Sequence, residues 1–351
     1  MSEVFPAFEA TAVTARFVDP AGQVVEHVVE VRTDPVTGRT ARVTLARSAE
    51  KERGTEWLPP PPPDAADVGA CPFCPPQRDR LTPVFAAKFA PQGRLVHGDS
   101  VLFPNLFPYG GYSAVSLFDD RHFVEIGTAA AHSYAGCLVN CQRYLDRVAQ
   151  TDPAAIFTAI TQNHLPSAGG SLLHPHLQIH ADRIAPNFLR YLEKRAADYR
   201  QATGGYLFSD LLAAELSHGA RVIGRTGDWH WLAAFAPEGF YEVWAILPQC
   251  VSIAAVSVPQ WRDLAEGITN AQKFYRSRNR NGYNLGLVAV AGADSALELR
   301  LRMVVRGNYG PWVRSDHTGY EVMLGDMATF QAPETTALQA RPFWQSDSRG
   351  G

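Results

Sequence analysis

The sequence predicts an α+β protein built from two copies of one unit, with antiparallel sheets and helices packed on one side of them. Two observations support this fold class. Segments with strand alternation flank two long segments with helical periodicity, and the order of these segments repeats along the chain. The length of 351 residues suits two such units.

Strands are expected where apolar and polar residues alternate, because successive side chains of a strand face opposite sides. Near the N-terminus, residues 24–33 and 41–48 alternate in this way. In the first unit, residues 99–118 and 154–162 do so, and a further strand is expected to carry His176.

Two segments have the spacing of amphipathic helices, with apolar residues three or four positions apart. The first spans residues 128–148 and the second residues 257–278. Their apolar stripes consist of Tyr134, Leu138, Cys141, Leu145 and Val148, and of Trp261, Leu264, Ile268, Ala271 and Tyr275. Each stripe is expected to face the sheet of its own unit.

The repeat is visible in the residues that precede each helix. Residues 108–122 align without a gap to residues 237–251, and their proline, glycine, tyrosine and apolar positions coincide. Two further strands, 281–292 and 296–306, then follow the second helix. An internal duplication is the simplest explanation of this order.

Composition excludes several classes of protein. Apolar residues make up 46% and charged residues 19% of the chain, as in soluble globular proteins, and the net charge of -3 offers no basic surface for nucleic acid. No apolar stretch is long enough for a membrane span, and the N-terminus lacks the pattern of a signal peptide. We therefore expect a cytoplasmic protein that binds neither nucleic acid nor membrane.

The stretch GGSLLHPHLQIHAD at residues 169–182 carries the strongest chemical signal. In a strand, His174, His176 and Gln178 share one face, and His180 continues it. The preceding AGGS, residues 168–171, is expected to turn backbone N–H groups toward an anion. A neutral imidazole beside such a turn is a good nucleophile for phosphorus, and the Gln amide can donate a hydrogen bond to a phosphoryl oxygen.

Incidental histidines on a strand are the alternative. For one histidine this would be the default, but three histidines and a glutamine on one face after AGGS favour a site. His180 alone is better explained as a buried, hydrogen-bonded residue. Cys71 and Cys74 form a CPFC pair whose spacing lets both thiolates reach one zinc ion, and the chain has no second pair of this kind. A redox pair and an unmetallated loop are the alternatives.

These motifs resemble the galactose-1-phosphate uridylyltransferase family of the histidine-triad superfamily. GGSLLHPHLQ is similar to the family's active-site motif, and FPNLFPYGG at 103–111 to its central strand. Residues 34–47 are similar to its N-terminal segment, and residues 319–341 to its C-terminal strand and helix. The resemblance implies two histidine-triad-like halves in one chain and a homodimer in which one subunit completes the other's pocket.

The resemblance also implies roles for individual residues. His176 would be the nucleophile that accepts a nucleoside monophosphate, with the backbone at His174 orienting its ring and Gln178 assisting. His122 and His174 would complete a structural zinc site with Cys71 and Cys74. The remaining implied contacts are to the nucleotide or its phosphates, from Arg47, Asn163 and Ser171. Gly169 and Gly170 are candidate phosphate contacts through the expected AGGS turn.

The chain departs from the family pattern in its second half. The family has a metal-binding His–x–His there, whereas this chain has Arg300 and Arg302, aligned with His174 and His176. Either these arginines clamp a phosphate or carboxylate, or they are exposed strand residues.

The sugar-binding segment is also only partly present. Gly319, Tyr320 and Glu321 match the family, but the Lys, Phe and Gln that bind its hexose phosphate are absent. Tyr320 is therefore a candidate substrate contact. Arg314, Asp316 and His317 are candidates for a different acceptor pocket.

The resulting interpretation is a nucleotidyltransferase that passes a nucleoside monophosphate through a covalent histidine to a phosphorylated small-molecule acceptor. A phosphorylase acting on nucleotide sugars or dinucleoside polyphosphates with phosphate or sulfate is one alternative. A hydrolase is another, which Gln178 disfavours, and a non-catalytic nucleotide-binding protein is the third. The expected parts are N-terminal strands of the nucleotide pocket (1–57), a proline-rich linker (58–70), a catalytic half with the zinc knuckle (71–190) and a degenerate half (191–345).

Overall fold

Ten strands from both predicted units form one continuous sheet in the computed structural model, which describes residues 5–44, 58–292, 294–309 and 315–345. The order of strands across the sheet is β4-β5-β6-β8-β7-β12-β13-β11-β10-β9, and every neighbouring pair is antiparallel. The second five strands repeat the order of the first five in reverse. The two units therefore meet where β7 pairs with β12.

The first half contributes β4 (Leu95–His97), β5 (Ser100–Pro104), β6 (Tyr112–Leu117), α3 (Ala131–Thr151), β7 (Phe157–His164) and β8 (His176–Asp182). The second half contributes β9 (Val222–Thr226), β10 (Trp229–Ala233), β11 (Phe240–Ile246), α6 (Val258–Ser277), β12 (Tyr283–Val290) and β13 (Arg300–Val305). Both predicted helices are confirmed within a few residues, and so is the α+β fold class. The domain boundaries drawn from the sequence remain a prediction.

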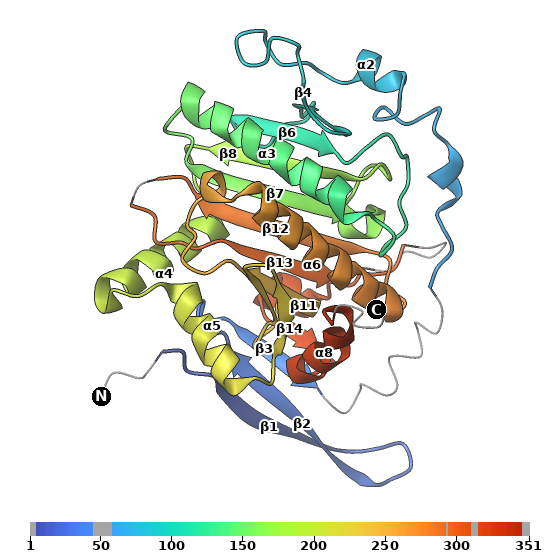
Figure 1. The fold of residues 1–351 in the computed structure, drawn as a ribbon. Coiled ribbons are helices and arrows are strands. Elements are labelled where there is room, and N and C mark those ends of the chain that lie inside the picture. Colours follow the sequence, from blue (N-terminus) through green and yellow to red (C-terminus); the bar gives the residue numbers. More distant parts are fainter. Residues whose placement is uncertain (1–4, 45–57, 293, 310–314, 346–351) are drawn as a thin grey trace, which may run out of the picture.

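Helices α3 and α6 lie side by side across one face of the sheet (Figure 1). All ten residues of the two predicted apolar stripes are buried there, against sheet residues such as Leu177, Ile179 and Leu301. Helix α6 begins with a capping box, in which Ser257 and Gln260 satisfy each other's backbone N–H groups. The spacing of apolar residues thus decides which side of the sheet the helices cover.

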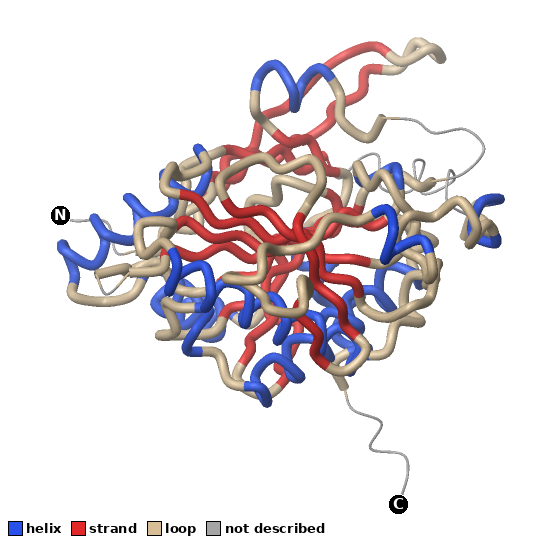
Figure 2. The backbone as a smooth tube through the Cα atoms, turned by 90° about the horizontal axis from the view of Figure 1, so that it is seen from above, coloured by secondary structure: helices blue, strands red, loops and turns tan. Residues whose placement is uncertain are grey.

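We call the other side of the ten-stranded sheet the open face. Helices α4 (Asn187–Thr203) and α5 (Leu207–His218) cover only its second-half end, where Leu192 and Leu211 join Trp244 and Ile246 in a separate apolar cluster. The repeat in the sequence does not predict these two helices. Figure 2 shows the sheet from its edge, with most of the helices below it.

A second, smaller sheet has the order β1-β2-β3-β14, formed by β1 (Glu9–Val18), β2 (Val24–Thr33), β3 (Thr40–Thr44) and β14 (Met327–Thr329). Strands β1 and β2 form a long hairpin that projects from the body (Figure 1). Short helices complete the fold: α2 (Gln77–Leu81), α7 (Gly319–Leu324) and α8 (Pro333–Ala340). Within the described part of the chain, no helix combines the length and the apolar character that a membrane crossing requires.

A buried polar cluster joins the two halves on the helix side. The hydroxyls of Tyr134 (α3) and Tyr283 (β12) each donate to Oε1 of Gln162 (β7), at 2.6 and 3.0 Å. Both accept from Nε2 of Gln272 (α6), at 2.8 and 3.0 Å. The four side chains are at most 2% exposed, so each depends on the others for its hydrogen bonds.

Candidate functional site

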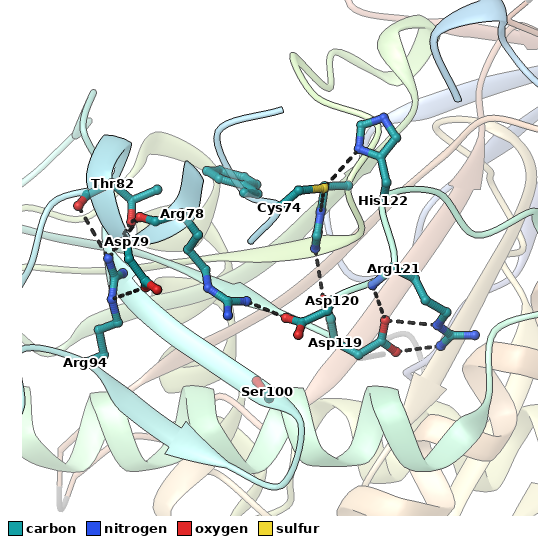
Figure 3. A network of polar contacts seen from close by, with 12 residues as sticks. Cys74, Arg78, Asp79, Thr82, Arg94, Ser100, Asp119, Asp120, Arg121 and His122 are labelled. Carbon is teal, nitrogen blue, oxygen red and sulfur yellow. Dashed lines mark hydrogen bonds and ion pairs between the residues drawn. The ribbon is translucent and has the colours of Figure 1, made fainter. Parts of the chain in front are cut away.

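Four predicted metal ligands converge next to the end of β6. One ligand atom from each of Cys71, Cys74, His122 and His174 lies within 4.8 Å of the others. Nδ1 of His122 and Nδ1 of His174 are 3.4 and 3.3 Å from Sγ of Cys74. Figure 3 shows Cys74 and His122 facing each other above the loop that carries Asp119 and Asp120.

Backbone carbonyls decide which nitrogen of each histidine faces the cluster. Nε2 of His174 bonds to the carbonyl of Asp119 at 2.9 Å, and Nε2 of His122 to the carbonyl of Asp64 at 3.1 Å. A carbonyl only accepts, so each Nε2 carries the proton and each Nδ1 presents a lone pair to Cys74. The single thiol proton of Cys74 can satisfy only one of them, whereas a metal cation satisfies both.

The distances also suit zinc. A tetrahedral zinc ion with its usual bond lengths places sulfur and nitrogen ligands roughly 3.5 Å apart, close to the separations in this cluster. Without a cation, burial and the neighbouring Cys71 raise the pKa of the Cys74 thiol to about 12. A reactive redox pair needs the opposite, an accessible thiol with a lowered pKa, so the cluster fits a metal better. These four residues could hold a structural zinc ion, which would tie residues 71–74 to the ends of β6 and β8.

The same cluster positions His176. The carbonyl oxygen of His174 accepts a hydrogen bond of 2.8 Å from Nδ1 of His176. Nδ1 therefore carries the proton, and Nε2 keeps the lone pair that a nucleophile needs. The ring of Phe73, which lies between the two cysteines in sequence, packs edge-on against His176 with centroids 5.3 Å apart.

His176 is 7% exposed, and burial lowers the pKa of its imidazole while the His174 carbonyl acts in the opposite direction. The neutral ring is therefore the dominant form at neutral pH. His176 is the first residue of β8, where its neighbour across the ladder is Leu117. Since Leu177 and Ile179 pack toward α3, the alternate residues His176 and Gln178 belong to the open face.

Gln178 lies in a row of residues that crosses the open face from one half to the other. Paired residues place Val115, Gln178, Thr161, Gly286, Arg302 and Trp244 side by side, in that order. Neighbouring strands are about 4.8 Å apart, so Gln178 and Arg302 are separated by roughly 14 Å. The open face is thus one surface shared by both halves.

The glycine turn before His176 differs from the expectation. The N–H groups of Gly169 and Gly170 donate to the carbonyls of Pro166 and Leu165, at 2.9 and 3.1 Å, and so close the turn on itself. They do not form the anion cradle that the sequence suggested. Gly170 is needed for another reason, because a Cβ there would lie 2.9 Å from the carbonyl oxygen of Asn163. Ser171 is exposed at the end of the turn.

Asn163 belongs to a polar chain that links both halves. Its Oδ1 accepts from Nδ2 of Asn284 at 2.7 Å, and Oδ1 of Asn284 accepts from Arg306 at 2.7 Å. Arg306 also pairs with Asp316 at 2.7 Å. Asn284 and Arg306 were not anticipated, because they lie more than a hundred residues from the motif that contains Asn163.

The register of the sheet corrects the alignment of the two halves. Leu117 faces His176 in the first half, and Ile246 faces Arg300 in the second. The gapless alignment of 108–122 with 237–251 makes Leu117 equivalent to Ile246. Arg300 therefore takes the place of His176 and not of His174, as the sequence comparison had suggested.

The same register places Arg302 where the first half has Gln178, and Glu298 where it has His174. Neither arginine is an exposed strand residue, which excludes the simpler of the two explanations. Arg300 is 5% exposed and stacks on Trp244 at 4.2 Å, and Arg302 pairs with Glu238 and Glu242 at 3.0 and 2.8 Å.

The remaining candidates fall elsewhere. Tyr320 lies on α7 beside the second sheet, where the guanidinium of Arg42 stands 5.8 Å from its ring. Asp316 is engaged with Arg306, and His317 lines a cavity next to Arg302. Arg47 and Arg314 lie outside the described residues.

Solved structures share this fold over nearly the whole chain. An ADP-glucose phosphorylase from Arabidopsis thaliana, solved with bound ADP-glucose, superposes with a TM-score of 0.69 over 89% of this chain and 98% of its own, at 19% identity. A uridylyltransferase mutant superposes with a TM-score of 0.66 over 92% and 99%, at 18% identity. The chain therefore shares the fold of these two enzymes.

Two proteins are also similar to the chain in sequence. A galactose-1-phosphate uridylyltransferase of Streptomyces lividans is 28% identical over 224 residues, which cover 61% of this chain and 55% of that protein. An uncharacterized protein of Archaeoglobus fulgidus is 27% identical over 326 residues, or 92% and 94% of the two chains. No protein-family model matches the chain.

Proposed function

We propose that the protein is a nucleotidyltransferase that works in two steps through a covalent nucleotidyl-histidine at His176. The observation that supports this most directly is the hydrogen bond between Nδ1 of His176 and the carbonyl of His174, which leaves Nε2 unprotonated. The fold shared with nucleotide-sugar enzymes supports the same class of reaction.

In the first step, Nε2 of His176 attacks the phosphorus of a nucleotide donor, and the bond to the phosphate-bearing leaving group breaks. The proton on Nδ1 stays in place, and the His174 carbonyl stabilises the positive charge that develops on the ring. In the second step, an oxyanion of the acceptor attacks the same phosphorus and the P–N bond breaks. Gln178 lies two residues along the same face, where its amide can donate to a phosphoryl oxygen.

Zinc has no part in these steps. When bound by Cys71, Cys74, His122 and His174, it would supply a fixed cross-link between chain segments. That link would hold the carbonyl of His174, and through its hydrogen bond the ring of His176, in one orientation. We therefore propose a structural role for the metal.

Two acceptors are compatible with the chain. The absence of the Lys, Phe and Gln that bind hexose phosphate in the family favours inorganic phosphate or sulfate, which makes the enzyme a phosphorylase or an adenylyltransferase. The structural similarity to an ADP-glucose phosphorylase supports a phosphorylase as the second candidate function. A hexose 1-phosphate remains the acceptor that the family resemblance implies.

Intact-mass spectrometry tests the proposal. The protein is incubated with nucleotide sugars, dinucleoside polyphosphates and adenylyl sulfate, next to His176→Ala and the control His230→Ala from the second half. We expect a mass gain of one nucleoside monophosphate in the wild type and the control, absent in His176→Ala and lost on adding phosphate or a sugar phosphate. Nucleotide binding without any adduct would support a non-catalytic binding protein instead.

A further inference from the structure

A cavity of about 310 Å³ lies on the open face of the second half. Gly286 on β12 lies in its floor, and a Cβ at this position would meet no atom within 4 Å. Phe188, Val288 and Val304 provide apolar walls, and Arg300 and Arg302 line it from β13.

The cavity occupies the second half's counterpart of the His176 site. The sheet register makes Arg300 equivalent to His176 and Arg302 equivalent to Gln178. In both halves these positions present their side chains to the open face. In the second half two cations therefore take the places of His176 and Gln178, and the cavity lies above them.

Within the described part of the chain, Arg300 is a buried cation without a hydrogen-bond or ion-pair partner. Two other arginines of the cavity are compensated, since Arg302 pairs with Glu238 and Glu242, and Arg306 pairs with Asp316. Arg300, 5% exposed, makes no hydrogen bond or ion pair with any described residue, and its Nε is buried without an acceptor.

The nearest charges do not replace that partner. Asp34, Glu242 and Glu238 act on Arg300 through space only. Oδ1 of Asp34 accepts from the N–H groups of Val36 and Thr37, and the two glutamates pair with Arg302. Trp244 and Phe208 offer Arg300 only ring faces, at 4.2 and 5.0 Å. A buried cation left unpaired is costly, so an anion in the adjoining cavity would stabilise the folded protein.

We propose that this cavity is a second anion site, which binds a small molecule that carries a phosphate or sulfate group. Arg300 binds that group, and the apolar part of the small molecule packs against Phe188 and Val288. Binding is non-covalent, because a protonated guanidinium has no lone pair with which to attack phosphorus. The site does not depend on the reaction proposed at His176. Asn284 lines the cavity and contacts Asn163, so the two sites adjoin across the β7–β12 boundary.

Nuclear magnetic resonance of arginine side chains tests the site directly. The Nε–Hε signal of Arg300 is assigned as the one that disappears in Arg300→Lys. Inorganic phosphate, sulfate and glucose 1-phosphate are then titrated to about 10 mM, at which a millimolar site is largely filled. We expect a saturable shift of this signal. Tighter binding of phosphate would indicate that the site takes a free anion, and tighter binding of glucose 1-phosphate would indicate a phosphate ester.

Two variants make the result specific. Gly286→Leu fills the cavity floor without a backbone clash, so the Arg300 signal should persist while affinity falls at least tenfold. Arg225→Met, which removes an exposed arginine at the far edge of the sheet, should titrate as the wild type does. An Arg300 signal that none of the three anions shifts, or a shift unchanged in Gly286→Leu, would overturn the proposal. Nucleotide labelling of His176 reports separately on the proposed function.

Discussion

The two halves of this chain have the same order of strands and the same helix position, yet they bury different side chains at equivalent positions. Where the first half has His176, the second has Arg300. Where the first half has His174 facing a cysteine cluster, the second has Glu298, whose carboxylate accepts from the N–H groups of Phe208 and Ser209 at the start of α5. Equivalent positions thus contact a neighbouring segment in both halves. His174 contacts the cysteines of residues 71–74, and Glu298 contacts the N-terminus of α5.

The comparison predicts that the halves cannot exchange roles. His176→Arg, which makes the first half resemble the second, should lower turnover by about 10⁴-fold or more, because it removes the proposed nucleophile. Adding Arg300→His to His176→Ala should not restore labelling, because Arg300 stacks on Trp244 and lacks the carbonyl partner that His176 has. A labelled double variant in intact-mass spectra would show that the second half is also competent.

The metal cluster should matter for the first half alone. Cys74→Ser should remove stoichiometric zinc, measured by elemental analysis, and lower the free energy of unfolding by about 3 kcal/mol or more. Cys250→Ser changes a half-buried thiol of the second half and should retain both zinc and stability. Wild-type protein purified without metal and equally stable after chelation would contradict a structural zinc site.

The first half also buries a histidine that gains its proton at a lower pH in the folded protein than in the unfolded chain. His164 is 7% exposed and stacked on Tyr283, and burial lowers its pKa to about 4, with a smaller contribution from His176. The unfolded chain binds this proton at a higher pH than the native state does. Stability should therefore be complete above about pH 6.5 and fall as the pH drops toward 4.

The size of this loss is ~3 kcal/mol for His164 alone. Urea unfolding at several pH values measures it, and His164→Phe should flatten the pH dependence. Replacing the exposed His132 by Phe serves as the control. An unchanged slope in His164→Phe would mean that other groups dominate the acid sensitivity.

The smallest expected effect concerns Gln178, which is equivalent to Arg302. Gln178→Ala should slow nucleotide transfer by about 10²-fold, the usual cost of removing one donor to a developing charge. Stopped-flow measurement of both half-reactions separates its effects on labelling and discharge. A loss below about twofold would mean that Gln178 does not contact the phosphoryl group.

The two long helices and the motifs of the first half could be predicted because their signals are local. The apolar stripes of α3 and α6 depend on a spacing of three to four residues, and the CPFC and HPHLQ motifs fix their own geometry. The equivalence of Arg300 was misjudged by two residues. A shift of two leaves every side chain of a strand on the same face, so the sequence pattern cannot detect it.

Other features depend on contacts between distant segments. Glu242 neutralises Arg302 from sixty residues away, and Asn284 reaches Asn163 across the boundary between the halves. Helices α4 and α5 do not follow from the repeat in the sequence, because they have no counterpart in the first half. The Gly169 and Gly170 amides were misassigned because their partners lie within the turn itself.

The cluster of Tyr134, Gln162, Gln272 and Tyr283 has a consequence for how the chain unfolds. Its four members come from α3, β7, α6 and β12, two elements from each half. If either half melted alone, the other would keep tyrosine or glutamine atoms buried without partners, at a cost of about 1–3 kcal/mol for each. That penalty, added to the rupture of the β7–β12 ladder, makes partial melting unfavourable. The duplicated chain should therefore lose its structure in a single cooperative transition, although its parts look like two domains.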